Sequence, residues 1–492
     1  MSQLSEIDVP AARPARTQLG SRALRNTALV LSAKVIARLI ALVTVLYMIR
    51  WLGKDHYGVF SVLINLTAIV SVVLDLGFNV LFVREGARQH TEIQRYLRNV
   101  MSLRLVMSLV AFVVLAGLVY AVGLNYLLVP GFLLMVFTSY STLLRNGLYA
   151  VQQLGYEAIG VVLESAVLLV LVLYGVLTRQ NVIYFVWAYA AQYAFSCVYF
   201  IAVLAIKRLG TPGWRFETAL LREWFWKGLP FALTFVLTIL YFRIDQPLIF
   251  EFRGHVEAGL YGAAYKPIEA LLFVPITFLS VVFPVLSVYH REQRADMMDA
   301  VNRFYKALLL MGVPMAVGIF VLARPLTPLL LGNDFIASAP ALRVLAIALG
   351  IAFINNAFIG ALNASDRQSS FTWAAAWSLV ANLALNLTLI PLFGYQGASW
   401  ATVATELVLA IAGWILVARH VGRIAVPALS WRILLAGLLM GAAVYPLSRF
   451  SGLEVLIPIA VGVVVYGVAV LLLRAVTRDE IAWARRALLT SR

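Results

Sequence analysis

Long apolar runs recur along almost the whole sequence and constrain the fold more than any other feature. Of the 492 residues, 62% are hydrophobic and only 13% are charged, and the mean hydropathy is +0.90. This composition is too apolar for a soluble globular protein. A membrane-spanning helix needs about 20 mostly apolar residues, whereas a membrane barrel needs alternating strands of about 10 residues, a pattern that these continuous runs do not show. The sequence therefore predicts an all-α polytopic membrane protein.

The apolar runs predict fourteen transmembrane helices. Their expected ranges are 27–49, 58–82, 100–122, 126–144, 157–177, 182–206, 228–250, 262–288, 304–325, 340–362, 371–392, 397–418, 431–447 and 453–473. The first 20 residues lack an apolar core, so they resemble a flexible tail more than a cleaved signal peptide. The first helix is then the expected insertion signal.

The distribution of basic residues predicts the orientation in the membrane. If the N-terminus is cytoplasmic, 27 of the 39 Lys and Arg residues fall on the cytoplasmic side, seven fall on the other side, and five lie in or near the hydrocarbon. By the positive-inside rule, both termini are expected in the cytoplasm. The net charge of +16 is spread over short loops and tails that face an anionic leaflet. These basic residues are therefore expected to interact with membrane lipids and not with nucleic acid.

Similar segments recur in the two halves of the chain. Tyr57-Gly58 and Tyr261-Gly262 each stand at the start of a span, and each following span ends in a charged stretch. The repeats predict two pseudo-symmetric six-helix lobes related by an axis along the membrane normal. The expected organisation is a cytoplasmic tail at 1–25, an N-lobe at 26–206, a cytoplasmic linker at 207–227, a C-lobe at 228–418, two appended helices at 431–473 and a cytoplasmic tail at 474–492.

Two cations interrupt the first apolar run. Lys34 and Arg38 are four residues apart and therefore share one face of the helix. A charge near the bilayer centre costs roughly 2.5–3.5 kcal/mol on insertion scales, so a compensating role is expected. Lys34 could instead extend along the helix to the cytoplasmic surface. Arg38 is harder to explain in that way, and its guanidinium suits bidentate contact with phosphate oxygens.

Further charges occur deep in other spans. Arg243 and Asp245 are two residues apart and cannot easily pair, so at least one must face another helix. Lys266 and Glu269 are three apart, which allows a local ion pair as readily as a functional role. The other carboxylates at depth are Asp75, which could simply pair with an arginine at the rim, and Glu164.

Motifs of enzymes and metal sites do not occur in the sequence. There is no GxxxxGK[ST] loop, no HExxH and no His/Cys cluster at metal spacing, so neither catalytic residues nor a metal site are expected. The lone Cys197 falls in an apolar run, where a packing role is expected. The longest connection, at 207–227, is far shorter than the extracytoplasmic loop on which a membrane enzyme would normally carry its active site. The protein is therefore not expected to be an enzyme.

Several segments together resemble the polysaccharide-transport family of oligosaccharide flippases. They are RWLGKDHYG, DLGFNVLFVREGARQ, FRIDQPLIF, GLYGAAYKPIEALLFVPITFLSVVFPVLS and FGYQGASWATVATE. The resemblance covers nearly the whole chain and extends to the superfamily that contains multidrug antiporters and the lipid II flippase. It implies two lobes around a cationic cavity that binds the pyrophosphate and sugar head of an undecaprenyl-linked glycan. It also implies a place in the bacterial inner membrane, beside a glycan polymerase and glycosyltransferases.

The combined interpretation is a flippase for a lipid-linked oligosaccharide that works by alternating access. Arg38, Lys34, Arg243 and Lys266 are the candidate substrate-binding residues. Asp75, Asp245, Glu164 and Glu269 are the candidates for proton or sodium coupling, and no other cofactor is expected. One alternative is a multidrug antiporter of the same superfamily, although a cavity for lipophilic cations should be acidic. The others are a membrane enzyme of glycan assembly and a structural membrane protein, for which buried cations would be a needless cost.

Overall fold

Helices form almost all of the chain that the structure describes, and no strand occurs within it. The computed structural model describes residues 15–292 and 294–476, so most of the two predicted tails lies outside the described residues. The α-helices are α1 (Ala15–Val70), α2 (Val72–Asp75), α3 (Phe78–Arg88), α4 (Ile93–Ala121), α5 (Leu128–Ala150), α6 (Leu154–Leu177), α7 (Val182–Ile206), α8 (Thr218–Arg243), α9 (Asp245–Arg253), α10 (His255–Glu292), α11 (Arg294–Leu331), α12 (Ala339–Ala364), α13 (Gln368–His420), α14 (Val426–Val444) and α15 (Leu456–Leu472). Short 3-10 turns span His90–Glu92, Asn125–Leu127, Asn333–Ser338, Tyr445–Arg449 and Gly452–Val455.

The described helices account for the fourteen predicted membrane crossings. Twelve helical segments are long and apolar enough to span a membrane, and two of them, Ser32–Asp75 and Gln368–His420, contain 44 and 53 residues. At 1.5 Å per residue, each of these two is about twice as long as the hydrocarbon core is thick. Each reverses at a glycine with positive φ, Gly53 (67°) or Gly394 (60°), a backbone conformation that side chains disfavour. Each of the two therefore supplies two crossings.

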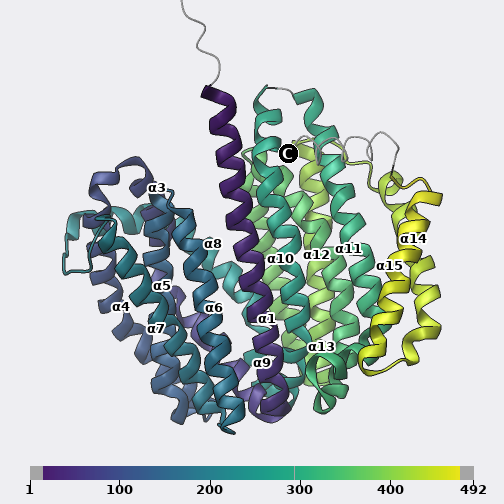
Figure 1. Cartoon of the computed structure of the whole chain (residues 1–492), viewed down its shortest axis with the longest axis horizontal. Helices are drawn as coiled ribbons and strands as arrows, with labels where there is room; N and C mark the ends of the chain where they lie inside the picture. The colour runs from purple at the N-terminus through teal and green to yellow at the C-terminus, as the bar shows by residue number, and fades with distance from the viewer. Residues whose placement is uncertain (1–14, 293, 477–492) are drawn as a thin grey trace, which may run out of the picture.

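The helices are arranged in two lobes (Figure 1). The N-lobe contains α1 to α7, the C-lobe contains α9 to α13, and α14 and α15 pack on the outer side of the C-lobe against α11. We call the end where α1 begins the terminal face, and the opposite end, where the chain turns at Gly53 and Gly394, the kink face. The described part of the chain also ends at the terminal face. The predicted fold class, with its two appended helices, is confirmed.

The second predicted span, 58–82, is not one helix, and this part of the prediction is wrong. The chain leaves the helix after Asp75, because Leu76 and Gly77 both have positive φ angles of 41° and 77°. The Asp75 carboxylate then accepts a hydrogen bond from the backbone N–H of Asn79 at 3.2 Å and so satisfies a free donor in the first turn of α3. The carboxylate thus stabilises the break that the hydropathy pattern conceals.

The seventh predicted span, 228–250, is also divided and begins earlier than expected. Helix α8 starts at Thr218, within the predicted linker, and ends at Arg243, after which α9 continues from Asp245. The first part of α8 packs against the N-lobe, where the indole of Trp224 lies 6.3 Å from the ring of Phe78. The last part reaches the C-lobe. Helix α8 therefore connects the two lobes along its own length.

The two lobes meet closely at the kink face. A Cβ atom on Gly58 would lie 1.8 Å from the carbonyl oxygen of His255, and one on Gly259 would lie 2.0 Å from that of Lys54. The backbones of α1 and α10 are therefore in direct contact. Arg50 adds hydrogen bonds to the last carbonyl groups of α11, including one of 3.2 Å to Leu330. Contact between the lobes at this end thus depends on glycines and on backbone acceptors.

At the terminal face, the connection between α7 and α8 is fastened to α4. The Nε atom of Arg95 donates to both carboxylate oxygens of Glu217 at 2.9 and 3.0 Å, and Arg215 also pairs with this carboxylate. The side chain of Asn99 accepts from the Glu217 backbone N–H at 2.7 Å. These hydrogen bonds, first of all those from Arg95, lower the pKa of Glu217 to about 2. The start of α8 is therefore held in place by an ionised carboxylate.

Replacing Gly259 by alanine should separate the lobes at the kink face, because the new methyl group would overlap the Lys54 carbonyl oxygen. We expect Ser61→Cys, a buried position near this contact, to react several times faster with a membrane-impermeant maleimide when Gly259→Ala is also present. The native Cys197 should first be replaced by serine. Gly467→Ala, where no atom lies within 4 Å, is the matched control, and equal labelling in both variants would contradict the prediction.

Glu217→Gln should lower the thermal stability of the purified protein at neutral pH, because Arg95 loses its ionised partner. The folded-state pKa is below the ordinary value of about 4.3, so the ionic contribution is present above that value and is lost as the pH falls toward about 2. Both side chains are partly exposed, so salt should weaken the effect. The difference in Tm between wild type and variant should therefore shrink with acidification; a constant difference would show that the charge is irrelevant.

Candidate functional site

A charged triad lies between the lobes. Arg243, at the end of α8, donates to one oxygen of Glu269 at 3.0 Å, and Lys266 donates to the other oxygen at 2.8 Å. The same guanidinium reaches the side-chain oxygen of Asn65 in the N-lobe at 3.4 Å. All three charged side chains remain about 30% exposed. Two cations therefore share one carboxylate, which leaves the triad with a net positive charge and free donor capacity.

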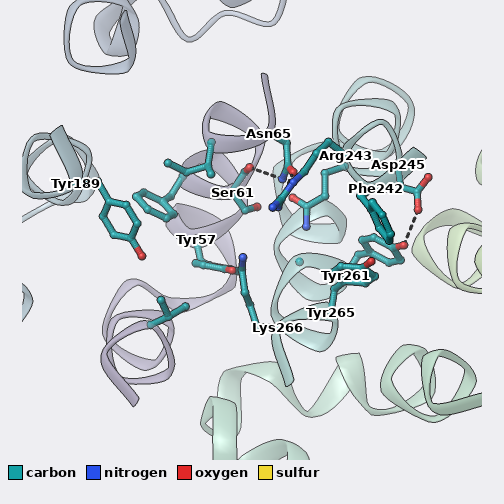
Figure 2. Close-up of a pocket in the computed structure, with 15 residues that line it drawn as sticks. Tyr57, Ser61, Asn65, Tyr189, Phe242, Arg243, Asp245, Tyr261, Tyr265 and Lys266 are labelled. Carbon is teal, nitrogen blue, oxygen red and sulfur yellow. Dashed lines mark hydrogen bonds between the residues drawn. The ribbon is translucent and has the colours of Figure 1, made fainter. Parts of the chain in front are cut away.

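The triad borders a pocket between the second half of α1 and helices α9 and α10 (Figure 2). Aromatic rings make up much of its wall, including those of Tyr57, Tyr189 and Tyr265. The hydroxyl of Tyr57 is buried and has no hydrogen-bond partner within the described chain. Figure 2 shows this hydroxyl directed toward the same space as the Lys266 ammonium. The pocket thus combines cations with neutral polar and aromatic groups.

The two cations of the first helix have different partners. The ammonium of Lys34 donates to the hydroxyl of Tyr149 at 2.7 Å and lies 3.3 Å from a carboxylate oxygen of Glu157. Lys34 is therefore held by the N-lobe, and the structure does not show it extended to the surface. Arg38 is exposed and lies over the ring of Phe273 in the C-lobe at 5.6 Å. Among the described residues, no carboxylate lies within 4.0 Å of Arg38.

Arg38 on α1 and Arg243 on α8 both lie near one residue of α7. The phenol of Tyr193, on α7, lies within electrostatic range of both guanidinium groups and also of Arg145. Long flexible side chains can thus present several positive charges to one region between the lobes. The sequence separation of about 200 residues between Arg38 and Arg243 conceals this convergence.

Two of the predicted carboxylates form ion pairs inside the N-lobe. Asp75 lies 3.1 Å from Arg104, a fully buried arginine that also donates to the side chain of Asn79 at 2.9 Å. Glu164 accepts from Arg145 at 2.7 Å and from the hydroxyl of Ser196 at 2.6 Å. Removing one partner of such a pair would leave a buried charge uncompensated. A structural role explains both carboxylates.

Asp245 has a different environment. It is buried, and one oxygen accepts from Tyr261 at 2.7 Å (Figure 2). The same oxygen accepts from Thr402 at 3.3 Å, and the other accepts from Asn386 at 2.8 Å. No Lys, Arg or His nitrogen of the described chain lies within 4.0 Å of it. The side-chain oxygen of Asn386 is also buried without a partner. Oxygen atoms from α9, α10 and α13 therefore gather around a carboxylate that lacks a cation.

The prediction about pairing is confirmed for the second half of the chain. Lys266 and Glu269 form the local pair that their spacing allows, and Arg243 and Asp245 face different neighbours. Sequence reasoning missed Glu157, which is the partner of Lys34, and Glu406, a further buried carboxylate on α13. The predicted span 126–144 also ended one residue before Arg145, which lies inside α5. An acidic residue within an apolar run was the available signal for both carboxylates.

Comparison with known proteins supports this description. The sequence profile of the family described as "Polysaccharide biosynthesis protein" matches residues 23–290, and that of "Lipid II flippase MurJ" matches residues 267–469. No curated protein sequence matches the chain.

Solved structures share the fold at low sequence identity. A structure of the lipid II flippase MurJ, described as inward closed, superposes with a TM-score of 0.74 at 16% identity and covers 91% of this chain and 99% of its own. An inward-facing multidrug resistance transporter of the MATE family gives 0.59 at 16% identity and covers 78% and 97%. A transporter of the same superfamily from Pyrococcus furiosus, whose binding pocket is described as having reverse polarity, gives 0.52 at 16% identity and covers 78% and 92%.

The first family profile spans more than half of the chain, and the fold agrees with it over nearly the whole length. The predicted family is confirmed: the chain belongs to the polysaccharide biosynthesis protein family.

Proposed function

We propose that this protein moves an undecaprenyl-pyrophosphate-linked oligosaccharide from the cytoplasmic to the periplasmic leaflet of the inner membrane. The observation that carries this proposal is that Arg243 and Lys266 line the pocket between the lobes, while Arg38 contacts Phe273 of the C-lobe and lies within electrostatic range of Tyr193, as Arg243 does. A pyrophosphate group is a dianion or more at neutral pH and accepts several charge-assisted hydrogen bonds. The cations of this region offer the matching donors, while the lipid tail remains in the bilayer.

The triad provides a way to bind and release an anion. Glu269 accepts hydrogen bonds from one N–H group of Arg243 and from the ammonium of Lys266. Arg243 retains further N–H donors, because a guanidinium carries five. A phosphate oxygen can therefore compete with Glu269 for these cations without leaving any of them unpaired afterwards. Such an exchange keeps the buried charges compensated before and after transport.

Arg38 is the first contact that we assign to the head group. It is exposed, it has no carboxylate partner in the described chain, and aromatic contact with Phe273 leaves its N–H groups free at the edge of the guanidinium. Lys34, held by Glu157 and Tyr149, then acts beside it as a weaker contact. Alternating access follows if the contact at the kink face opens while the lobes approach each other at the terminal face.

The charge of the site argues against a drug antiporter. The MATE transporters share the fold, but the fold alone does not define a substrate. Arg38 and the triad together leave a net positive charge between the lobes, which would repel a lipophilic cation. An anionic substrate fits this electrostatic field.

We further propose that Asp245 binds the coupling ion. The other three candidates have basic partners: Asp75 pairs with Arg104, Glu164 with Arg145, and Glu269 with two cations. Asp245 is surrounded only by neutral hydrogen-bonding groups, including Thr402. A buried carboxylate without a cation is expected to take up a proton, and clustered oxygen atoms can alternatively hold a small hard cation such as Na⁺.

Arg38→Ala should strongly reduce display of the surface glycan at unchanged protein levels. Loss of charged hydrogen bonds costs roughly 1.5–3 kcal/mol, which corresponds to about tenfold to hundredfold weaker binding. Arg38→Lys should rescue export only partly, because an ammonium lacks the bidentate geometry. Arg343→Ala is the matched control, since Arg343 also lies over a ring, at 5.7 Å from that of Phe320, but does not line the pocket. Unchanged glycan display in Arg38→Ala would refute the role of this cation.

Asp245→Asn should remove the response of the purified protein to its coupling ion. If Na⁺ binds, replacing choline chloride by sodium chloride should raise the Tm of the wild type and leave that of the variant unchanged. If a proton binds, the Tm of the variant should instead depend less on pH than the Tm of the wild type. Glu164→Gln is the control for loss of a carboxylate that has a basic partner. Identical behaviour of wild type and Asp245→Asn in both measurements would exclude Asp245 as the coupling site.

A further inference from the structure

Glu406 is a second buried carboxylate of the C-lobe. It belongs neither to the charged triad nor to the hydrogen-bonding groups around Asp245. Glu406, in the second half of α13, is only 7% exposed. One of its oxygen atoms accepts from the hydroxyl of Tyr241 on α8 at 2.9 Å, and the other accepts from the side-chain amide of Asn355 on α12 at 2.6 Å. Glu406 thus joins three helices.

None of the partners of Glu406 carries a charge. Within the described chain, no Lys, Arg or His nitrogen lies within 4.0 Å of its carboxylate, in contrast to Glu164 and Glu269. An isolated carboxylate taken from water into a low-dielectric interior costs far more than two neutral hydrogen bonds return. The group avoids this cost by binding a proton.

Among the described residues around Glu406, the hydrogen-bond donors are neutral and no cation contacts the carboxylate. From α9, Asp245 lies near Tyr265 of α10, whose phenol is within electrostatic range of both Asp245 and Glu406. From α8, Arg243 is engaged by Glu269. From α12 the contact is the neutral Asn355, and along α13 itself the neighbouring polar groups are the uncharged Asn382 and Thr405. A second carboxylate nearby makes simultaneous ionisation of both groups unfavourable.

The geometry also provides a place for the proton. A tyrosine hydroxyl can donate or accept, so Tyr241 can donate to the ionised carboxylate or accept from the protonated one at the same 2.9 Å separation. Protonation therefore forms one O–H bond at Glu406 and breaks no helix contact. Ionisation would leave a charge that only water or a cation could stabilise.

We propose that Glu406 is a proton-binding site of the C-lobe, separate from Asp245, and that its carboxyl group is protonated in this conformation. The site lies where Tyr241 of α8 is hydrogen-bonded to Glu406 of α13. Helix α8 also packs on the N-lobe through Trp224. Separation of α8 from α13 would admit water to the carboxyl group and release the proton. The significance of this release for transport rests on the proposed function, whereas the protonation itself does not.

Infrared spectroscopy of the purified full-length protein tests the protonation without any substrate. At neutral pH, the wild type should show the C=O band of a buried carboxylic acid, and Glu406→Gln should lose the contribution of one such group. Asp245→Asn should leave that contribution in place, which separates the two sites. Glu164→Gln is the control, because the ionised carboxylate paired with Arg145 contributes no such band.

Tyr241→Phe provides a second measurement in case Glu406→Gln does not fold. Removal of the Tyr241 hydroxyl group deletes one hydrogen bond to the carboxyl group of Glu406. The C=O band of this group should therefore shift in frequency and keep its intensity. The proposal would be overturned if Glu406→Gln removed no carboxylic acid band and Tyr241→Phe shifted none. If glycan export did not depend on Arg38, the proposed function would be overturned. The infrared test of Glu406 would still stand, because it does not involve the substrate.

Discussion

The need to compensate every charge inside an apolar bundle shapes the rest of this structure. Because the bilayer supplies no water, a buried ion must find a partner or lose its charge. In the N-lobe, Asp75 and Glu164 have arginine partners, which bind helices together. Between the lobes, the Arg243–Glu269–Lys266 triad has more positive than negative charge. Deep in the C-lobe, Asp245 and Glu406 have only neutral partners. The structural role and the two proposed roles, substrate binding and ion coupling, thus differ in the kind of charge compensation.

Helix breaks and close glycine contacts place these groups. The reversals at Gly53 and Gly394 turn two long helices back into the bundle, and Gly58 and Gly259 bring the two lobes into backbone contact. Helix α8 crosses from one lobe to the other and ends at Arg243. A change at the C-lobe carboxylates therefore has a direct mechanical route to the N-lobe, through a single helix.

The sequence predicted those features that depend on residues close together in the chain. Apolar runs identified the crossings, and the spacing of Lys266 and Glu269 predicted their pairing, because both signals depend on neighbours within one or a few helical turns. The same reasoning failed at Leu76, where the hydropathy stays high across a break that is defined by positive φ angles. It also missed the interruption at Ile244 between α8 and α9. It also missed Glu157, whose partner Lys34 lies more than 100 residues away.

By itself, the sequence determined that this chain forms fourteen membrane-crossing helices in two related halves, since the bilayer demands long apolar segments and the repeats are visible in the residues. Only the tertiary structure decided which charges are neutralised. The i,i+4 cations of the first helix look equivalent in the sequence, yet Lys34 has an anionic partner and Arg38 has none in the described chain. Compensation of a buried charge depends on atoms a few ångströms away in space, and helices distant in the sequence supply them.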